Sequence, residues 1–162
     1  MRKILAAGSM ALLLASPAFA EIRIAHVYGK TGALEAYAEQ SHIGLMLGLE
    51  YATGGTMEID GEPIVVIEKD TQLKPDVGKA VLAEAYGDDD AHIAVGPVSS
   101  GVALAMLPVA EEYERLLIVE PAVADSITGA NWNRYIFRTG RNSSQDAIAN
   151  AVALGGDGVT VA

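Results

Sequence analysis

The chain has 162 residues, of which 51% are hydrophobic and 20% are charged, and its formal net charge is −10. An acidic chain repels nucleic acid and anionic membrane surfaces, so neither is expected as a partner. The sequence contains no cysteine, which excludes disulfides and the metal sites built on thiolates.

The first 20 residues have the pattern of a secretory signal peptide. Arg2 and Lys3 precede an apolar run over Ile4–Ala15, and Ala18-Phe19-Ala20 is a cleavage site of small residues. The apolar run is shorter than a membrane-spanning helix requires. We therefore expect a signal peptide over residues 1–20, export to the periplasm and a mature chain that begins at Glu21.

Beyond this segment, short apolar stretches alternate with stretches of helical periodicity. The apolar stretches are rich in β-branched residues, which is typical of buried strands. Strands are predicted over Ile22–Val27, Ile64–Glu68, Ala91–Val95, Leu116–Val119 and Tyr135–Arg138. Helices are predicted over Leu34–Tyr51, Val77–Tyr86, Gly101–Glu114 and Ser144–Leu154. This alternation predicts an α/β fold, with a mostly parallel open sheet and helices on both faces.

The end of the chain indicates a further unit. The last predicted helix is closed by Gly155-Gly156, and residues 158–162 begin another strand. A parallel strand at a sheet edge with no helix after it is unusual. We expect residues 21–154 to form one ligand-binding lobe, residues 155–162 to begin a second lobe, and the chain to be a fragment of a longer protein.

A serine pair follows the third predicted strand. After the turn Gly96-Pro97-Val98, Ser99 and Ser100 open the next helix. The free N–H groups and the dipole of a helix N-terminus attract an anion, and open α/β sheets bind ligands outside the carboxyl ends of their strands. Serine is also a preferred N-cap residue, so a purely structural capping role is the alternative.

Similar short motifs follow the other strands. They are Thr31-Gly32-Ala33-Leu34, Lys69-Asp70, Val119-Glu120-Pro121-Ala122-Val123-Ala124 and Phe137-Arg138-Thr139. Together with the serine pair, their order and spacing resemble those of the substrate-binding proteins of branched-chain amino-acid ABC transporters, from Ile22 to the C-terminus. The resemblance implies the type I periplasmic binding protein fold, whose two lobes close on a ligand, and this chain would be the first lobe.

The resemblance also implies a set of ligand-binding residues. Ser99 and Ser100 would hold the ligand carboxylate, with Ser100 as the direct contact, and the carbonyl of Ala122 would face the ligand ammonium. At Ala124, where the family usually has threonine, only the backbone N–H remains as a donor, which departs from ordinary recognition of an amino-acid head group. Tyr37 and Val98 would line the same pocket. For Tyr37, Ala122 and Ala124, a plain packing role is the alternative.

The function implied is that of a monomeric periplasmic component of an ABC importer. It would capture branched-chain or other hydrophobic amino acids as small-molecule ligands and present them to a membrane permease, without a cofactor or a metal. A binding protein for aromatic carboxylic acids, or the ligand-binding domain of a sensor or receptor, is the alternative. No enzyme is expected, because the sequence lacks the G-x-S-x-G, HExxH and P-loop patterns. His26, His42 and His92 are scattered, without the spacing of metal ligands.

Overall fold

The computed structural model describes residues 20–155 and contains a six-stranded sheet in the order β2-β3-β1-β4-β5-β6. All neighbouring pairs are parallel except β2 with β3, which is antiparallel. The strands are β1 (Ile22–Tyr28), β2 (Glu58–Ile59), β3 (Glu62–Asp70), β4 (Ile93–Val95), β5 (Leu116–Val119) and β6 (Ile136–Arg138). The predicted mostly parallel sheet is therefore confirmed.

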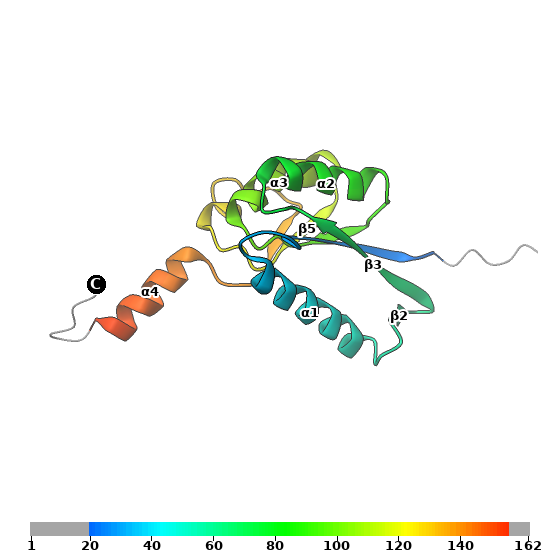
Figure 1. Ribbon diagram of the computed structural model, residues 1–162, viewed down its shortest axis with the longest axis horizontal. Coiled ribbons are helices and arrows are strands. Elements are labelled where there is room, and N and C mark those ends of the chain that lie inside the picture. The colour runs from blue at the N-terminus through cyan, green and yellow to red at the C-terminus, as the bar shows by residue number, and fades with distance from the viewer. Residues whose placement is uncertain (1–19, 156–162) are drawn as a thin grey trace, which may run out of the picture.

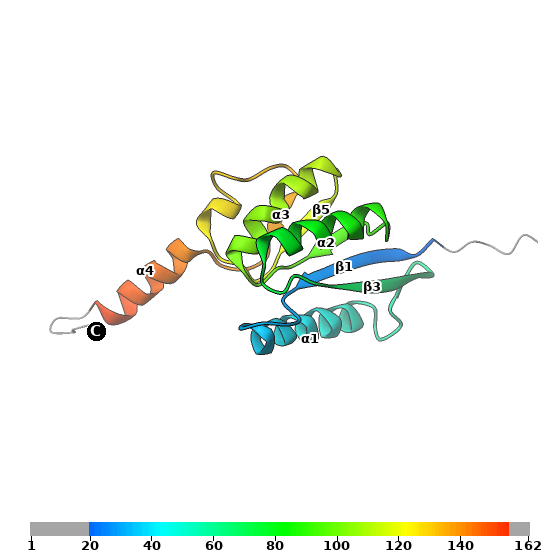
Figure 2. The ribbon, with the colours of Figure 1, turned by 45° about the horizontal axis from the view of Figure 1, so that its top comes forward.

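Helices cover both faces of this sheet, as the alternation of elements predicted (Figures 1 and 2). They are α1 (Glu35–Ala52), α2 (Pro75–Gly87), α3 (Ser100–Glu112) and α4 (Ser143–Leu154). Figure 2 shows α2 and α3 side by side on one face and α1 on the other. Pro75 opens α2, where its missing N–H and fixed φ are tolerated.

The main hydrophobic core lies between the sheet and the pair α2 and α3. It is built from side chains of β1, β5 and the two helices, such as Val27, Leu82, Met106 and Leu117. Close packing of α2 on α3 depends on Gly78, because a Cβ there would lie 2.4 Å from Cγ1 of Val102.

The face that carries α1 is only partly covered. Ala38 is the one buried residue of α1, and the helix contacts the sheet mainly at β1. On this face no helix of residues 20–155 other than α1 lies near β4, β5 and β6 (Figure 2). Phe137 of β6, which follows the buried Ile136 and so points to the opposite face from it, is 54% exposed. A parallel sheet is normally covered on both faces, so this part of the lobe is the least protected.

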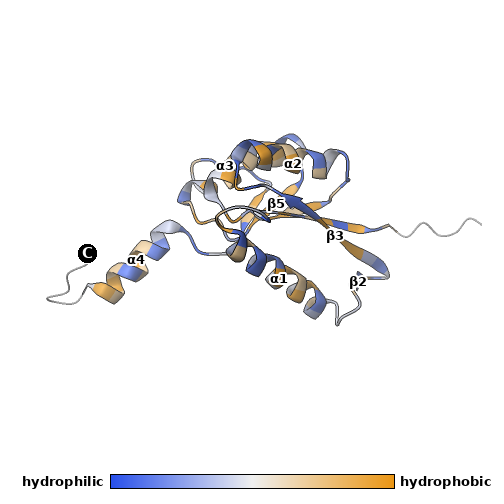
Figure 3. Ribbon diagram, in the orientation of Figure 1, coloured by the Kyte–Doolittle hydropathy of each residue, from blue (hydrophilic) through white to orange (hydrophobic). Residues whose placement is uncertain are grey.

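The last helix extends away from the sheet (Figure 1). It contains no buried residue, and both hydrophobic and hydrophilic residues occur along it (Figure 3). Its start is defined by a capping box, in which the Asn142 side chain accepts from the Gln145 N–H and the Gln145 side chain accepts from the Asn142 N–H.

Most predicted bounds differ from those of the structure by one or two residues, and two of the differences lie at the start of β3. The two-residue strand β2 was not predicted, and β3 begins at Glu62 rather than Ile64, because the turn at Asp60-Gly61 joins them into a hairpin. Both turn residues have positive φ, 53° and 85°. The predicted signal peptide, but for its last residue, and the predicted strand at 158–162 lie outside the described residues.

Candidate functional site

The candidate site lies at the carboxyl ends of β1, β4 and β5. The neighbouring parallel strands β1 and β4 mark the point where the strand order reverses. From β1 the chain continues to β3 on one side, and from β4 it continues to β5 on the other side. Open α/β sheets bind ligands at such a switch point. The chain leaves β4 through Gly96, which has φ +123° and lies so close to β1 that a Cβ would be 2.0 Å from the Val27 carbonyl oxygen. Glycine is required there because any side chain would strike the β1 backbone.

The serine pair stands at the N-terminus of α3. Ser99 occupies the N-cap position in an extended conformation, but it makes no side-chain capping hydrogen bond. The alternative that a serine merely caps this helix is therefore wrong for Ser99. The Ser100 hydroxyl faces the loop after β5, where it accepts the N–H groups of Val123 at 3.2 Å and Ala124 at 3.1 Å.

The loop after β5 is held close to the serine pair. The N–H of Ala122 donates to the Pro97 carbonyl oxygen at 3.2 Å, and the Ala122 side chain is buried. On the other side, the Arg138 guanidinium donates to the Ala124 carbonyl oxygen at 2.9 Å. The structure therefore brings Ser99, Ser100, Ala122 and Ala124 together from two neighbouring strand ends.

Val98 and Tyr37 have different surroundings. Val98 is buried in a small cluster with Tyr28, Ala38 and Leu73, which lies between α1 and the sheet. Tyr37 is 43% exposed on α1. The pKa of Arg141 is raised mainly by a hydrogen bond to Asp146 and, to a smaller extent, by one to Tyr37. Tyr37 therefore lies beside the segment that leads into α4.

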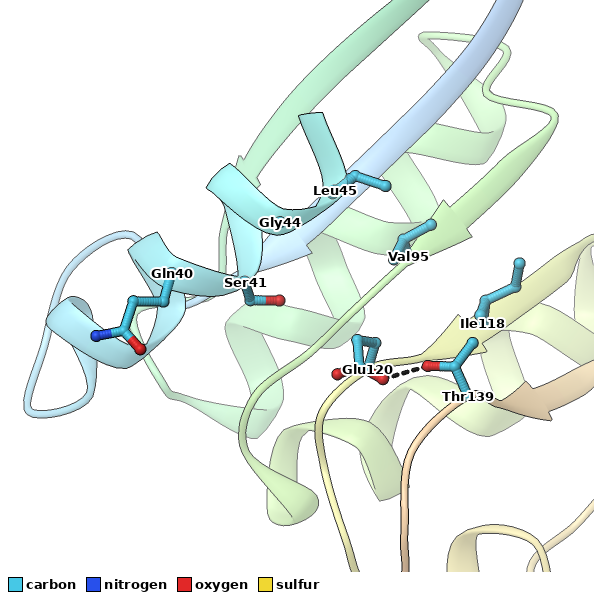
Figure 4. Close-up of a pocket in the computed structure, with 8 residues that line it drawn as sticks. All are labelled: Gln40, Ser41, Gly44, Leu45, Val95, Ile118, Glu120 and Thr139. Atoms are coloured by element: carbon cyan, nitrogen blue, oxygen red, sulfur yellow. Dashed lines mark hydrogen bonds between the residues drawn. The ribbon is translucent and has the colours of Figure 1, made fainter. Parts of the chain in front are cut away.

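A pocket of about 500 Å³ lies beside α1 on the open face of the sheet (Figure 4). Its lining comes from α1, from β4 and β5, and from the residues that directly follow β5 and β6. The lining residues are Gln40, Ser41, Gly44, Leu45, Val95, Ile118, Glu120 and Thr139. None of the six predicted site residues is among them. Glu120 accepts a hydrogen bond from Thr139, as the dashed line in Figure 4 shows. A carboxylate side chain in the lining opposes an anionic ligand, so the α3 N-terminus is the better site for a carboxylate.

A cluster of rings that the sequence did not reveal joins β1 to α1. The Nδ1 atoms of His26 and His42 are 2.9 Å apart, and both rings stack with Tyr28 at centroid distances of 4.2 and 5.3 Å. The fold thus brings together two histidines that lie 16 residues apart in the sequence. His26 is fully buried and its Nε2 has no hydrogen-bond partner among residues 20–155. Burial, with a smaller effect of the nearby His42, lowers the pKa of His26 to about 4.

The same cluster continues into β3. The Tyr28 hydroxyl donates to Glu68 at 2.5 Å, and Lys30 pairs with the same carboxylate at 2.9 Å. These two hydrogen bonds, that of Tyr28 first, lower the pKa of Glu68 to about 2. Within residues 20–155 no three histidine or acidic side chains are grouped to hold a metal ion. The same residues contain no helix long and apolar enough to cross a membrane.

Comparisons with known proteins identify relatives of the chain. A family model described as periplasmic binding protein matches residues 21–160. The crystal structure of an ABC-type branched-chain amino acid transporter from Rhodopseudomonas palustris is 70% identical, with a TM-score of 0.80 over 83% of this chain and 36% of that one. A solute binding protein of an ABC transporter from R. palustris, in complex with benzoate, is 26% identical, with a TM-score of 0.75 over 83% of this chain and 37% of that one.

A further relative comes from an archaeon. The chemotactic signal transduction system substrate-binding protein BasB of Halobacterium salinarum is 30% identical over 129 residues, which are 78% of this chain and 31% of that protein. The chain thus spans about a third of the length of these relatives. Because the family model matches almost all of the chain after residue 20, and the fold agrees, the chain belongs to the periplasmic binding protein family.

Proposed function

We propose that residues 21–154 are the first ligand-binding lobe of an exported substrate-binding protein of an ABC importer. In this proposal residues 1–20 direct export, a second lobe begins after residue 154, and the protein acts as a monomer in the periplasm. It performs no reaction on its ligand. The second lobe closes over the ligand by a hinge motion, as in other binding proteins of this kind. A membrane permease then recognises the closed, ligand-bound form.

The hydrogen bonding of Ser100 is the observation that carries the proposal. A hydroxyl group has two acceptor positions and one proton to donate. Both acceptor positions of Ser100 are taken by N–H groups of Val123 and Ala124, so its proton remains for a ligand. A carboxylate beside the start of α3 would accept a hydrogen bond from this hydroxyl and gain from the helix dipole, which is the arrangement that an amino acid or another small carboxylic acid requires.

Branched-chain and other hydrophobic amino acids are the proposed ligands. The 70% identical relative, described as a branched-chain amino acid transporter, supports this choice. Aromatic carboxylic acids are the second candidate, because one relative was crystallised with benzoate. Ala124 also favours them, since it lacks the hydroxyl that would help to hold an amino-acid head group. The likeness to BasB supports, as a third candidate, a ligand-binding domain that serves a sensor.

Calorimetry on the full-length protein tests the proposal. Leucine, isoleucine and valine should bind, while benzoate and 4-hydroxybenzoate should not; the reverse result would replace the amino acids with aromatic acids. Ser100→Ala should weaken binding by about 1–3 kcal/mol, the cost of a lost hydrogen bond to a charged group. Ser99→Ala is the matched comparison, because Ser99 belongs to the same pair but Ser100 is the proposed direct contact, and it should weaken binding less than Ser100→Ala does.

Two results would contradict the proposed site. One is an unchanged affinity of Ser100→Ala when circular dichroism shows an intact fold. The other is an equal loss in Ser99→Ala and Ser100→Ala, which would mean that any change at the start of α3 disturbs binding.

A further inference from the structure

The loop after β5, residues 120–125, makes contacts on two sides. Toward α3 it is held by Ser100 and by the Pro97 carbonyl oxygen, as described above. Toward the other side it contacts the first residues of α4. The loop therefore lies between the proposed ligand site and the helix that leads out of the lobe.

Four hydrogen bonds join the loop to the start of α4. The N–H and the hydroxyl of Ser143 both donate to the Val123 carbonyl oxygen, at 2.8 and 3.0 Å. The N–H and the hydroxyl of Ser144 donate to the two oxygens of Asp125, at 3.1 and 2.5 Å. The hydroxyl bond from Ser144, followed by its backbone bond, lowers the pKa of Asp125, so this carboxylate is ionised at neutral pH.

One other link among residues 20–155 bears on the direction of α4, because Arg141 bonds both to Asp146 of this helix and to Tyr37 of α1. The helix has no buried residue. Arg141 and Asp146 pair at 2.7 Å, but that bond joins the connecting segment to the helix itself and not to the loop. Asp125 is therefore the side chain from the body of the lobe that engages two donors of α4 at once.

We propose that Asp125 is a positioning residue that ties the loop after β5 to α4, so that the loop and the helix move as one body. The bidentate carboxylate fixes both the distance and the rotation of the first turn of α4, which a single bond would leave free. The functional consequence rests on the proposed function: a ligand that shifts the loop beside Ser100 shifts α4 with it, and by reciprocity the direction of α4 changes the affinity for the ligand by the same factor.

Distance measurements between two spin labels test this proposal without a ligand, so the outcome does not depend on the proposed function. The chain has no cysteine, so labels can be placed uniquely at Ile148→Cys on α4 and Tyr51→Cys at the end of α1, both exposed. The parent should give a narrow distance distribution. Asp125→Ala should at least double its width, while Asp125→Asn, which retains one acceptor, should give an intermediate width.

Asn150→Ala is the matched control, because it removes an exposed polar side chain of the same helix without touching the loop or Arg141. Its distribution should stay as narrow as that of the parent. Asp125 is exposed, so its variants should fold, which far-ultraviolet circular dichroism checks. The proposal is overturned if Asp125→Ala leaves the distribution unchanged, or if Asn150→Ala broadens it equally.

The coupling should also be visible from the helix side. Ser144→Ala removes one of the two bonds to Asp125, so hydrogen exchange at the amides of Val123 and Ala124 should become several-fold faster. Unchanged exchange at these two amides would mean that the helix does not restrain the loop, and the proposal would then fail.

Discussion

Acidification should destabilise the protein through His26. The folded state holds this side chain fully buried, beside His42, with a pKa lowered from 6.5 to about 4. The unfolded chain therefore takes up a proton between these two values that the folded chain does not. Because the folded pKa is the lower one, stability is lost as the pH falls below 6.5, and the loss is complete below about pH 4.

The expected size follows from the same two values. At pH 5, which is about 1.5 units below the unfolded pKa, the loss is about 2 kcal/mol at 1.36 kcal/mol per unit. The loss through Glu68 has the same sign, because its folded pKa is also lowered, from 4.5 to about 2, but this loss begins only below pH 4.5. A comparison between pH 7.5 and pH 5 therefore isolates the histidine.

Urea unfolding followed by circular dichroism at pH 7.5, 6 and 5 measures this loss. His26→Phe keeps a ring against Tyr28 but cannot titrate, so the fall between pH 7.5 and pH 5 should shrink by about 2 kcal/mol relative to the parent. A fall in His26→Phe as large as that of the parent would refute the assignment.

Two further substitutions test the backbone and the core by the same urea assay. Gly96→Ala should cost about 3 kcal/mol or more, because φ is +123° and the new Cβ would lie 2.0 Å from a β1 carbonyl oxygen. Gly55→Ala shares a positive φ of +88° but has nothing within 4 Å, so a loss as large as that of Gly96→Ala would show that contact with β1 is not the cause. Tyr86→Phe should cost about 1–2 kcal/mol, because the buried hydroxyl donates to a β5 carbonyl oxygen at 2.9 Å. Tyr113 is partly exposed, so Tyr113→Phe should cost less than about 0.5 kcal/mol. An equal loss of stability in Tyr86→Phe and Tyr113→Phe would contradict a role for the Tyr86 bond.

The order and type of the main elements could be read from the sequence because each depends on local patterns. The strand Leu116–Val119 was predicted with the bounds that the structure has, since four apolar residues are closed by charged or turn residues on both sides. The strand Glu58–Ile59 was missed, although Asp60-Gly61 is a strong hairpin signal, because two residues show no periodicity.

The contacts within the site could be predicted only in part. A serine pair at a strand end is a local pattern, and the position of the crevice follows from the sheet. The pairing of His26 with His42 joins a strand to a helix, and no spacing along the chain encodes it. The same holds for Ser100, whose partners come from a loop more than 20 residues later.

Among residues 20–155 no side chain of α4 is buried, so within this part of the chain the helix can open as a unit of its own. Its 12 residues are near the length below which an isolated helix is marginal in water, so its helical state depends on the capping box and the bonds of its first turn. Opening of its far end, at Leu154, does not require the sheet to open. Local unfolding of α4 and global unfolding of the lobe are therefore distinct equilibria, and denaturant midpoints report the sheet with α2 and α3 rather than the last helix.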